Sequence, residues 1–135
     1  MNYQIKAASI SNQDAEIQIK KSNIAFGTTA KSNETLPNPA ELFLGSFASC
    51  VLKNVERFSV MMKFTYTKAT IEVNAVRLEN PPRMENIDYN LTVYSSDTNL
   101  NTALLKKNIE KHGTIYNTVK LCCNITGIVS LVENV

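Results

Sequence analysis

The chain has 135 residues, 44% of them hydrophobic and 19% charged, which is typical of one soluble domain with a real core. Its net charge of only +2 argues against the strongly basic surface of a nucleic-acid-binding or membrane-surface protein. The longest near-apolar run, residues 42–52, is about half the roughly 20 residues that a membrane-spanning helix needs. We therefore expect a cytoplasmic protein with reduced cysteines and with no nucleic-acid or membrane partner.

The N-terminal segment is predicted to form a small sheet. Residues 2–10 and 13–20 are predicted strands joined by the polar turn "SNQD". In the second of them, Ala15, Ile17 and Ile19 alternate with polar residues, which is the period of a half-buried strand. Residues 23–29 are expected to continue the sheet, and the proline-containing residues 30–39 to form a loop.

A long helix follows, with a clear start signal. Asn38 can serve as N-cap, Pro39 suits the first helical position, and Glu41 stands three residues after the cap. We predict a helix from Pro39 to about Met62. Its first half is apolar or small on nearly every face, so it is expected to be buried on most sides. Its second half is amphipathic, with one apolar stripe of Val51, Val55, Phe58 and Met62.

The remaining chain alternates strands with helices. Residues 66–79 and 86–95 alternate apolar and polar side chains around the turn "NPPRMEN" and predict an antiparallel hairpin. An amphipathic helix over residues 101–113, with Gly113 as its stop, is expected to turn Leu104, Leu105 and Ile109 inward. A short helix (114–122) and a final strand (123–134) complete one α+β domain over residues 1–135, with antiparallel sheets and a long central helix.

The sequence lacks the patterns that are typical of the most common kinds of active site. The single histidine, His112, stands at a helix end, where it is better explained as a cation beside the helix dipole than as part of a catalytic triad. No cysteine or histidine pattern of a metal site is present, and the four glycines are isolated, so no metal, nucleotide or other cofactor is predicted.

The cysteines remain as candidates. Cys50 lies within "FLGSFASCVLKN" and is either a nucleophile or a small core residue. A nucleophilic thiol needs a nearby cation, and Lys53 and Arg57 could supply one from the same side of the helix. Cys122 and Cys123 are adjacent at the expected start of the last strand, so their side chains should point to opposite faces as packing residues.

Small residues surround Cys50 on the long helix. They are Gly45, Ser46, Ala48 and Ser49. Such residues permit another backbone to approach closely, and one sheet in so small a domain offers too little cover for this helix. We therefore expect a homodimer with this helix near the interface.

The segment "NPAELFLGSFASCVLKNVERF" resembles the OsmC/Ohr family of osmotically inducible and organic-hydroperoxide-resistance proteins, and the resemblance extends over about residues 1–132. It implies an OsmC-like fold and an intertwined homodimer whose active sites lie at the subunit interface. It also implies that Cys50 is the peroxidatic cysteine and that Glu41 supports it. In active members a second cysteine closes a disulfide with the oxidised first one, and a dithiol reductant reopens it.

The chain departs from this pattern in three places. Gly113 stands at the position of the second cysteine. The family usually supports the thiolate with an arginine from the N-terminal region, but no arginine precedes Arg57 in this chain. Ala40 stands where the most active members carry an acid, whereas Glu41 matches the more widely shared position. The leading prediction is thiol-dependent reduction of organic hydroperoxides through Cys50, with an external thiol as reductant. The alternative is a non-catalytic dimer that binds a small apolar ligand, with Cys50 as a packing residue.

Overall fold

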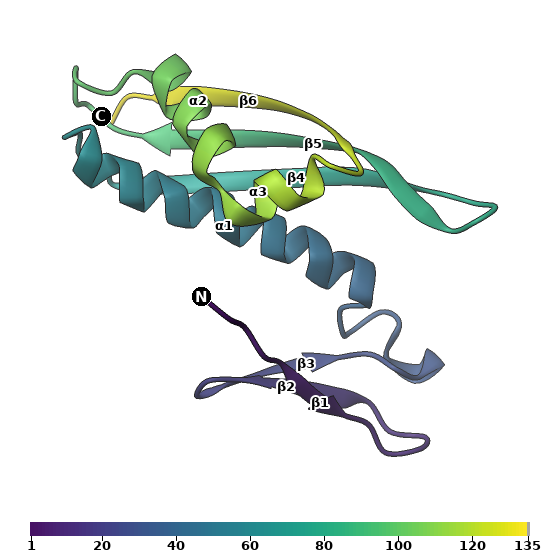
Figure 1. Cartoon of the computed structure of the whole chain (residues 1–135). Coiled ribbons are helices and arrows are strands. Elements are labelled where there is room, and N and C mark those ends of the chain that lie inside the picture. The colour runs from purple at the N-terminus through teal and green to yellow at the C-terminus, as the bar shows by residue number, and fades with distance from the viewer. Residues whose placement is uncertain (135) are drawn as a thin grey trace. The chain divides into compact units, whose positions relative to one another are not determined.

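The structure, a computed structural model, describes residues 1–134. Its contacts divide the chain into two compact units, Met1–Phe43 and the residues from Leu44 onward. Figure 1 shows the order of the helices and strands. Among the described residues, no helix combines the length and the apolar character needed to cross a membrane.

The first unit is built on a three-stranded antiparallel sheet. It contains β1 (Lys6–Ala8), β2 (Ala15–Ile19) and β3 (Ser22–Phe26) in that order, followed by the short 3-10 helix η1 (Ala30–Ser32). The predicted strands are confirmed, although they are shorter than expected.

A carboxylate fastens the loop that follows this sheet. Asp14 Oδ1 accepts hydrogen bonds from the Ser32 hydroxyl and from the backbone N–H groups of Thr28 and Thr29. These hydrogen bonds, that of Ser32 foremost, lower the pKa of Asp14 to about 2. Asp14 therefore stays charged at neutral pH and holds the loop at the end of β3.

Helix α1 (Pro39–Met61) confirms the predicted long helix almost to the residue. It starts with the predicted capping box, because Glu41 N donates to Asn38 Oδ1 at 2.8 Å while Asn38 N donates to Glu41 Oε1 at 3.1 Å. One face is buried, consisting of Phe47, Val51, Asn54, Val55, Phe58 and Ser59.

The first half of α1 is less covered than expected. Phe47 is its one fully buried side chain among the described residues, whereas Gly45 and Ser49 are exposed. A methyl group built on Gly45 would meet no atom within 4 Å. The expectation of burial on most sides is therefore not met within a single chain.

The second unit contains a mixed three-stranded sheet. Its strands are β4 (Lys68–Leu78), β5 (Arg83–Tyr94) and β6 (Asn124–Val132), in the order β4-β5-β6. The predicted β4–β5 hairpin is confirmed, but β6 pairs with β5 in parallel, so the expectation of purely antiparallel sheets is wrong here. The reason is the connection: α2 (Thr102–His112) and α3 (Thr114–Val119) return the chain to the end of the sheet at which β5 began.

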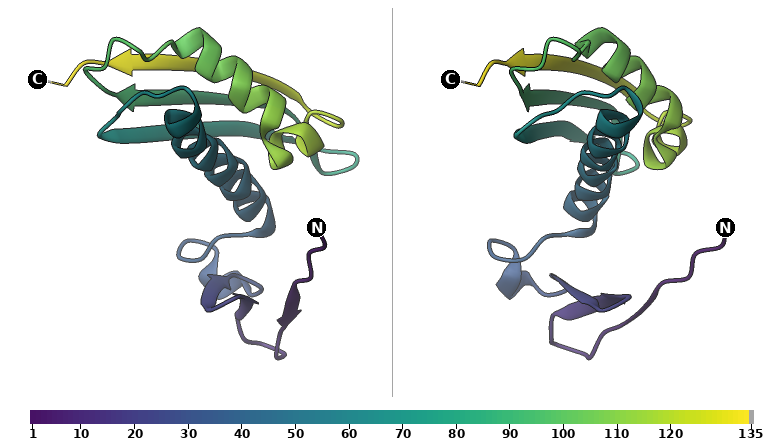
Figure 2. Two further views of the ribbon diagram at one scale, coloured as in Figure 1. Left: turned by 60° about the vertical axis from the view of Figure 1, so that its left-hand side comes forward. Right: turned by 90° about the vertical axis from the view of Figure 1, so that its left-hand side faces the viewer.

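The helices cover one face of this sheet. Figure 2 shows α1 and α2 on the same side of β4, β5 and β6. Alternate residues of β5 point toward them, and Ile87, Tyr89, Leu91 and Val93 are at most 1% exposed. The predicted inward residues Leu105 and Ile109 of α2 are fully buried, but Leu104, in the first turn of α2, is 44% exposed and does not belong to the core.

One glycine lets the sheet close over an aromatic ring. Gly127 of β6 pairs with Tyr89 of β5. A Cβ atom on Gly127 would lie 2.1 Å from the Tyr89 ring, which is far inside van der Waals contact. The missing side chain therefore makes room for the largest fully buried residue of the core.

Candidate functional site

The Cys50 thiol lies on α1 beside a side-chain amide. Cys50 is partly buried and free, and Asn54 follows it by one helical turn. Asn54 Nδ2 donates to the Cys50 carbonyl oxygen at 2.8 Å and lies 3.7 Å from Cys50 Sγ. Because Asn54 is only 7% exposed, this amide is held in place by its surroundings. The arrangement offers a hydrogen-bond donor to negative charge on the sulfur.

Gly113 lies close to the same sulfur. It is buried at the junction between α2 and α3, and a Cβ atom on it would lie 3.1 Å from Cys50 Sγ. The same Cβ would lie 3.0 Å from the Ile109 carbonyl oxygen and 3.1 Å from Tyr116 Cβ. The chain thus brings the α2–α3 junction into direct proximity with the thiol. The position predicted to replace the second cysteine is adjacent to the first.

A polar network fastens this junction to the sheet. The Tyr89 hydroxyl donates to Glu110 Oε2 at 2.8 Å, and Lys106 Nζ lies 3.2 Å from the same oxygen. Burial, followed by the Glu110 carboxylate, raises the pKa of Tyr116 to about 12, and the same two causes raise that of Tyr89. The Phe47 ring packs against both tyrosine rings, with centroids 5.9 Å apart in each pair. Both tyrosines therefore remain neutral and structural.

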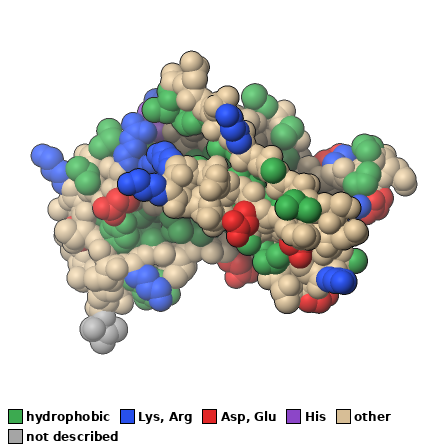
Figure 3. Space-filling view, turned by 90° about the horizontal axis from the view of Figure 1, so that it is seen from below, with side chains coloured by type: hydrophobic (Ala, Val, Ile, Leu, Met, Phe, Trp, Pro, Cys, Tyr) green, Lys and Arg blue, Asp and Glu red, His purple; other side chains and the backbone are tan. Residues whose placement is uncertain are grey.

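The predicted cations make no bond to the thiol within the part of the chain that the structure describes. Lys53 and Arg57 are both exposed to solvent. On the face drawn in Figure 3, several Lys and Arg side chains lie close together. The Arg57 guanidinium carbon lies 5.5 Å from the centre of the Phe58 ring, and that ring also packs against His112. Within residues 1–134, no hydrogen bond or ion pair joins Lys53 or Arg57 to Cys50. A role for Arg57 at the thiol stays a prediction.

Glu41 acts at the start of α1 through the capping box described above. Its role in supporting the thiol likewise stays a prediction. Two open surface hollows of about 390 and 380 Å³ are lined by residues 6–18 and 56–67 respectively, and Cys50 lines neither of them.

Asn54 was not singled out from the sequence. Asparagine within a helix usually faces solvent, because its side chain competes with the backbone for hydrogen bonds. A signal was nevertheless available, since Asn54 stands four residues after Cys50 and within the apolar stripe of Val51, Val55 and Phe58. A polar residue on a buried stripe needs a partner, and Cys50 supplies it.

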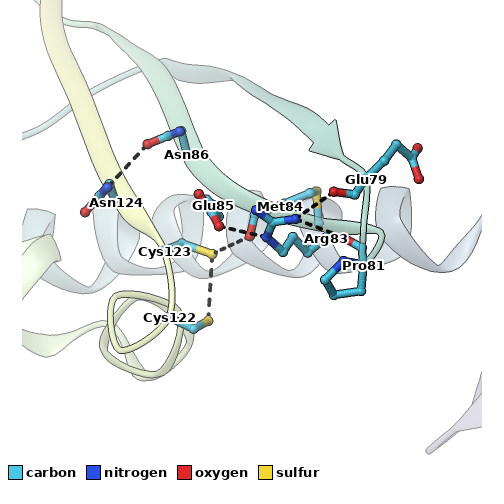
Figure 4. A network of polar contacts seen from close by, with 9 residues as sticks. All are labelled: Glu79, Pro81, Arg83, Met84, Glu85, Asn86, Cys122, Cys123 and Asn124. Atoms are coloured by element: carbon cyan, nitrogen blue, oxygen red, sulfur yellow. Dashed lines mark hydrogen bonds and ion pairs between the residues drawn. The ribbon is translucent and has the colours of Figure 1, made fainter.

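The vicinal cysteines depart from their predicted geometry. Cys122 and Cys123 lie in the turn between α3 and β6, not within the strand, so the alternation of strand side chains does not apply to them. Their sulfur atoms are 3.7 Å apart, and Figure 4 draws this contact as a dashed line. Cys123 is buried as predicted for a packing residue, but Cys122 is exposed. The expectation of opposite faces is therefore wrong.

Comparison with known proteins identifies the family and the fold. The family model described as OsmC-like protein matches residues 31–126. No curated protein matches the chain. An OsmC-like protein from Mycoplasma pneumoniae superposes with a TM-score of 0.84 at 18% identity, covering 98% of each chain.

Two further solved structures have the same fold. The organic hydroperoxide resistance protein OsmC from Legionella pneumophila gives a TM-score of 0.65 at 12% identity over 96% of each chain. An organic hydroperoxide resistance protein from Elizabethkingia anophelis gives 0.67 at 13% identity over 99% of each chain. With the family model spanning most of the sequence and the fold shared end to end, the chain belongs to the OsmC-like family.

Proposed function

We propose that this protein reduces organic hydroperoxides in the cytoplasm through the Cys50 thiol, with an external thiol as reductant. The observation that carries the proposal is the proximity of Cys50 Sγ to two groups: the Asn54 amide, at 3.7 Å, and Gly113, on which a Cβ atom would lie 3.1 Å from the sulfur. The family contains proteins named for organic hydroperoxide resistance, which supports the same chemistry. Glu41 would contribute by holding the start of α1.

The reaction needs one sulfur and an external donor of electrons. The Cys50 thiolate attacks the terminal oxygen of the hydroperoxide, the O–O bond breaks, and the alcohol leaves with a proton. Cys50 is then a sulfenic acid. A first external thiol condenses with it to a mixed disulfide and water, and a second releases Cys50 as a thiol together with the external disulfide.

We expect the active form to be a homodimer. Gly45 has open space around it, and Tyr3, Ile5 and Ile10 of the first unit are each more than half exposed. A three-stranded sheet with so little cover needs an apolar partner surface. Light scattering at micromolar concentration should give about twice the 15.0 kDa chain mass. A monomer under these conditions would contradict this part of the proposal.

The catalytic role is tested by oxidation of the reduced protein with cumene hydroperoxide. We expect the intact mass to increase by one oxygen, a sulfenic-acid reagent to trap the product on Cys50, and turnover with dithiothreitol. The Cys50→Ser variant should lose all three signals, whereas Cys122→Ser should keep them. An unmodified Cys50 at millimolar peroxide, with no turnover, would instead favour the non-catalytic dimer that binds a small apolar ligand.

Replacing Asn54 should slow this oxidation. Asn54→Leu keeps the side-chain size but removes the donor near Cys50 Sγ. Since a hydrogen bond to a charged group contributes about 1.5 kcal/mol at the low end, we expect roughly a tenfold slower rate of sulfenic-acid formation. Val60→Leu, at an exposed position of the same helix, is the control and should change the rate less than about twofold. Equal rates in both variants would show that Asn54 only packs.

A further inference from the structure

A second pair of thiols lies outside the Cys50 site. Cys122 is exposed and Cys123 is 8% exposed, and both are free. Their sulfur atoms are 3.7 Å apart in the turn that leads from α3 into β6. Figure 4 shows the two sulfurs side by side near the start of β5, joined by a dashed line. One side of the pair is therefore open to reagents from solvent.

Each sulfur is held by a different part of the backbone. Cys123 Sγ donates to the Met84 carbonyl oxygen of β5, and Cys122 Sγ donates to the Val119 carbonyl oxygen at the end of α3, both at 3.4 Å. Nearby, Arg83 is engaged by Glu85 at 2.7 Å. The spacing of the thiols is thus set by two anchored elements.

The donor set selects a particular kind of ligand. Within residues 1–134 no group of three or more cysteine, histidine or acidic side chains is arranged to hold a metal ion. Zinc, which takes four such ligands, is therefore a poor fit to this pair. Trivalent arsenic fits better, because it is soft, pyramidal and satisfied by two adjacent sulfurs plus one group that it carries itself.

The protonation state of Cys123 fits the same ligand. Burial, followed by the neighbouring Cys122 thiol, raises the pKa of Cys123. A neutral thiol is a weak nucleophile toward peroxides, which react with thiolates. Condensation with an arsenic-bound oxygen instead uses the thiol proton, because that proton leaves with the oxygen as water.

We propose that Cys122 and Cys123 form a vicinal dithiol site that captures trivalent arsenicals through two arsenic–sulfur bonds. With phenylarsine oxide, both S–H bonds and the arsenic–oxygen bond break, two arsenic–sulfur bonds form, and the oxygen leaves with both protons as one water molecule. No atom changes oxidation state, so no oxidant or reductant is needed. The site is independent of the hydroperoxide chemistry at Cys50.

The test uses the full-length reduced protein and one equivalent of phenylarsine oxide. Intact mass should show a single phenylarsenic group that has replaced two hydrogens, and only one thiol per chain should then titrate. Since the second arsenic–sulfur bond forms within one chain, displacement should need at least about tenfold more monothiol than for the Cys122→Ser variant. A dithiol such as dimercaptopropanol should release the adduct readily.

The variants assign the adduct to its residues. Cys122 is exposed, so Cys122→Ser should fold normally and lose the bridging adduct, while Cys50→Ser should retain it. The proposal is overturned if Cys50→Ser abolishes the adduct, or if Cys122→Ser binds phenylarsine oxide as tightly as the unaltered chain. Failure of hydroperoxide reduction would leave both results unaffected.

Discussion

Gly113→Cys is expected to give a protein that closes a disulfide with Cys50 when treated with cumene hydroperoxide. A Cβ atom at position 113 would lie 3.1 Å from Cys50 Sγ, and a disulfide places a Cβ at roughly 3 Å from the partner sulfur. The Gly113 backbone has φ −70° and ψ 118°, a conformation that any L-residue adopts. The substitution therefore supplies the second cysteine in a position from which its sulfur reaches the first.

The product distinguishes the variant from the natural chain. Instead of gaining one oxygen, the oxidised variant should lose two hydrogens, and Cys50 and the introduced thiol should both disappear from thiol titration. Gly113→Ser is the matched control, because it brings the same crowding against Ile109 and Tyr116 without a thiol, and it should still form the sulfenic acid.

A general oxidant separates geometry from catalysis in this experiment. Diamide should close the same disulfide even if Cys50 does not react with hydroperoxides. If neither oxidant produces the intramolecular bond, the adjacency of Cys50 and Gly113 is wrong. If diamide succeeds where the hydroperoxide fails, the geometry stands and the proposed activity is contradicted.

Phe47→Ala should lower the free energy of unfolding by about 3–5 kcal/mol, the usual range for a buried phenylalanine. Phe47 is completely buried and its ring contacts Tyr89 of β5 and Tyr116 of α3. Removing the ring leaves a cavity where α1, α3 and the sheet meet. Urea unfolding at one fixed protein concentration measures the loss, because the proposed dimer would make stability concentration-dependent.

The control for this variant lies on the same helix. Lys53→Ala changes an exposed position of α1 and should alter the free energy of unfolding by no more than about 0.5 kcal/mol. A loss below about 1 kcal/mol in Phe47→Ala would mean that the site collapses around the gap, and that the ring is not central to the packing.

The parts of the fold that sequence predicts well are those with local signals. The start of α1 was predictable because Asn38, Pro39 and Glu41 each fit one position of a capping box. The β4–β5 hairpin was predictable because alternation and a turn occur together. The parallel direction of β6 was not, because alternating side chains do not reveal which way a strand runs, and the α2–α3 connection only limits the choice.

The candidate site was likewise only partly predictable from the sequence. Cys50 could be singled out by its unusual setting and by the family resemblance, but its neighbours come from tertiary packing. Gly113 reaches it from 63 positions later in the sequence. The proximity of Cys122 and Cys123 could not be predicted because it depends on where β6 begins. The strand was expected to start at residue 123, but it starts at Asn124, so both cysteines lie in a turn, where adjacent side chains can come close together.

The contact between Gly127 and Tyr89 also fixes how β6 joins the sheet. A shift of β6 by one residue against β5 would put Thr126 or Ile128 beneath the Tyr89 ring. Neither side chain fits there, because even a Cβ atom at this position would clash with the ring. The same shift would turn the apolar residues of β6 away from the helices. The absence of a side chain at Gly127 thus selects the register of β6 against β5. This matters because β6 comes from a part of the chain distant from β5 in sequence, so no short turn sets its register.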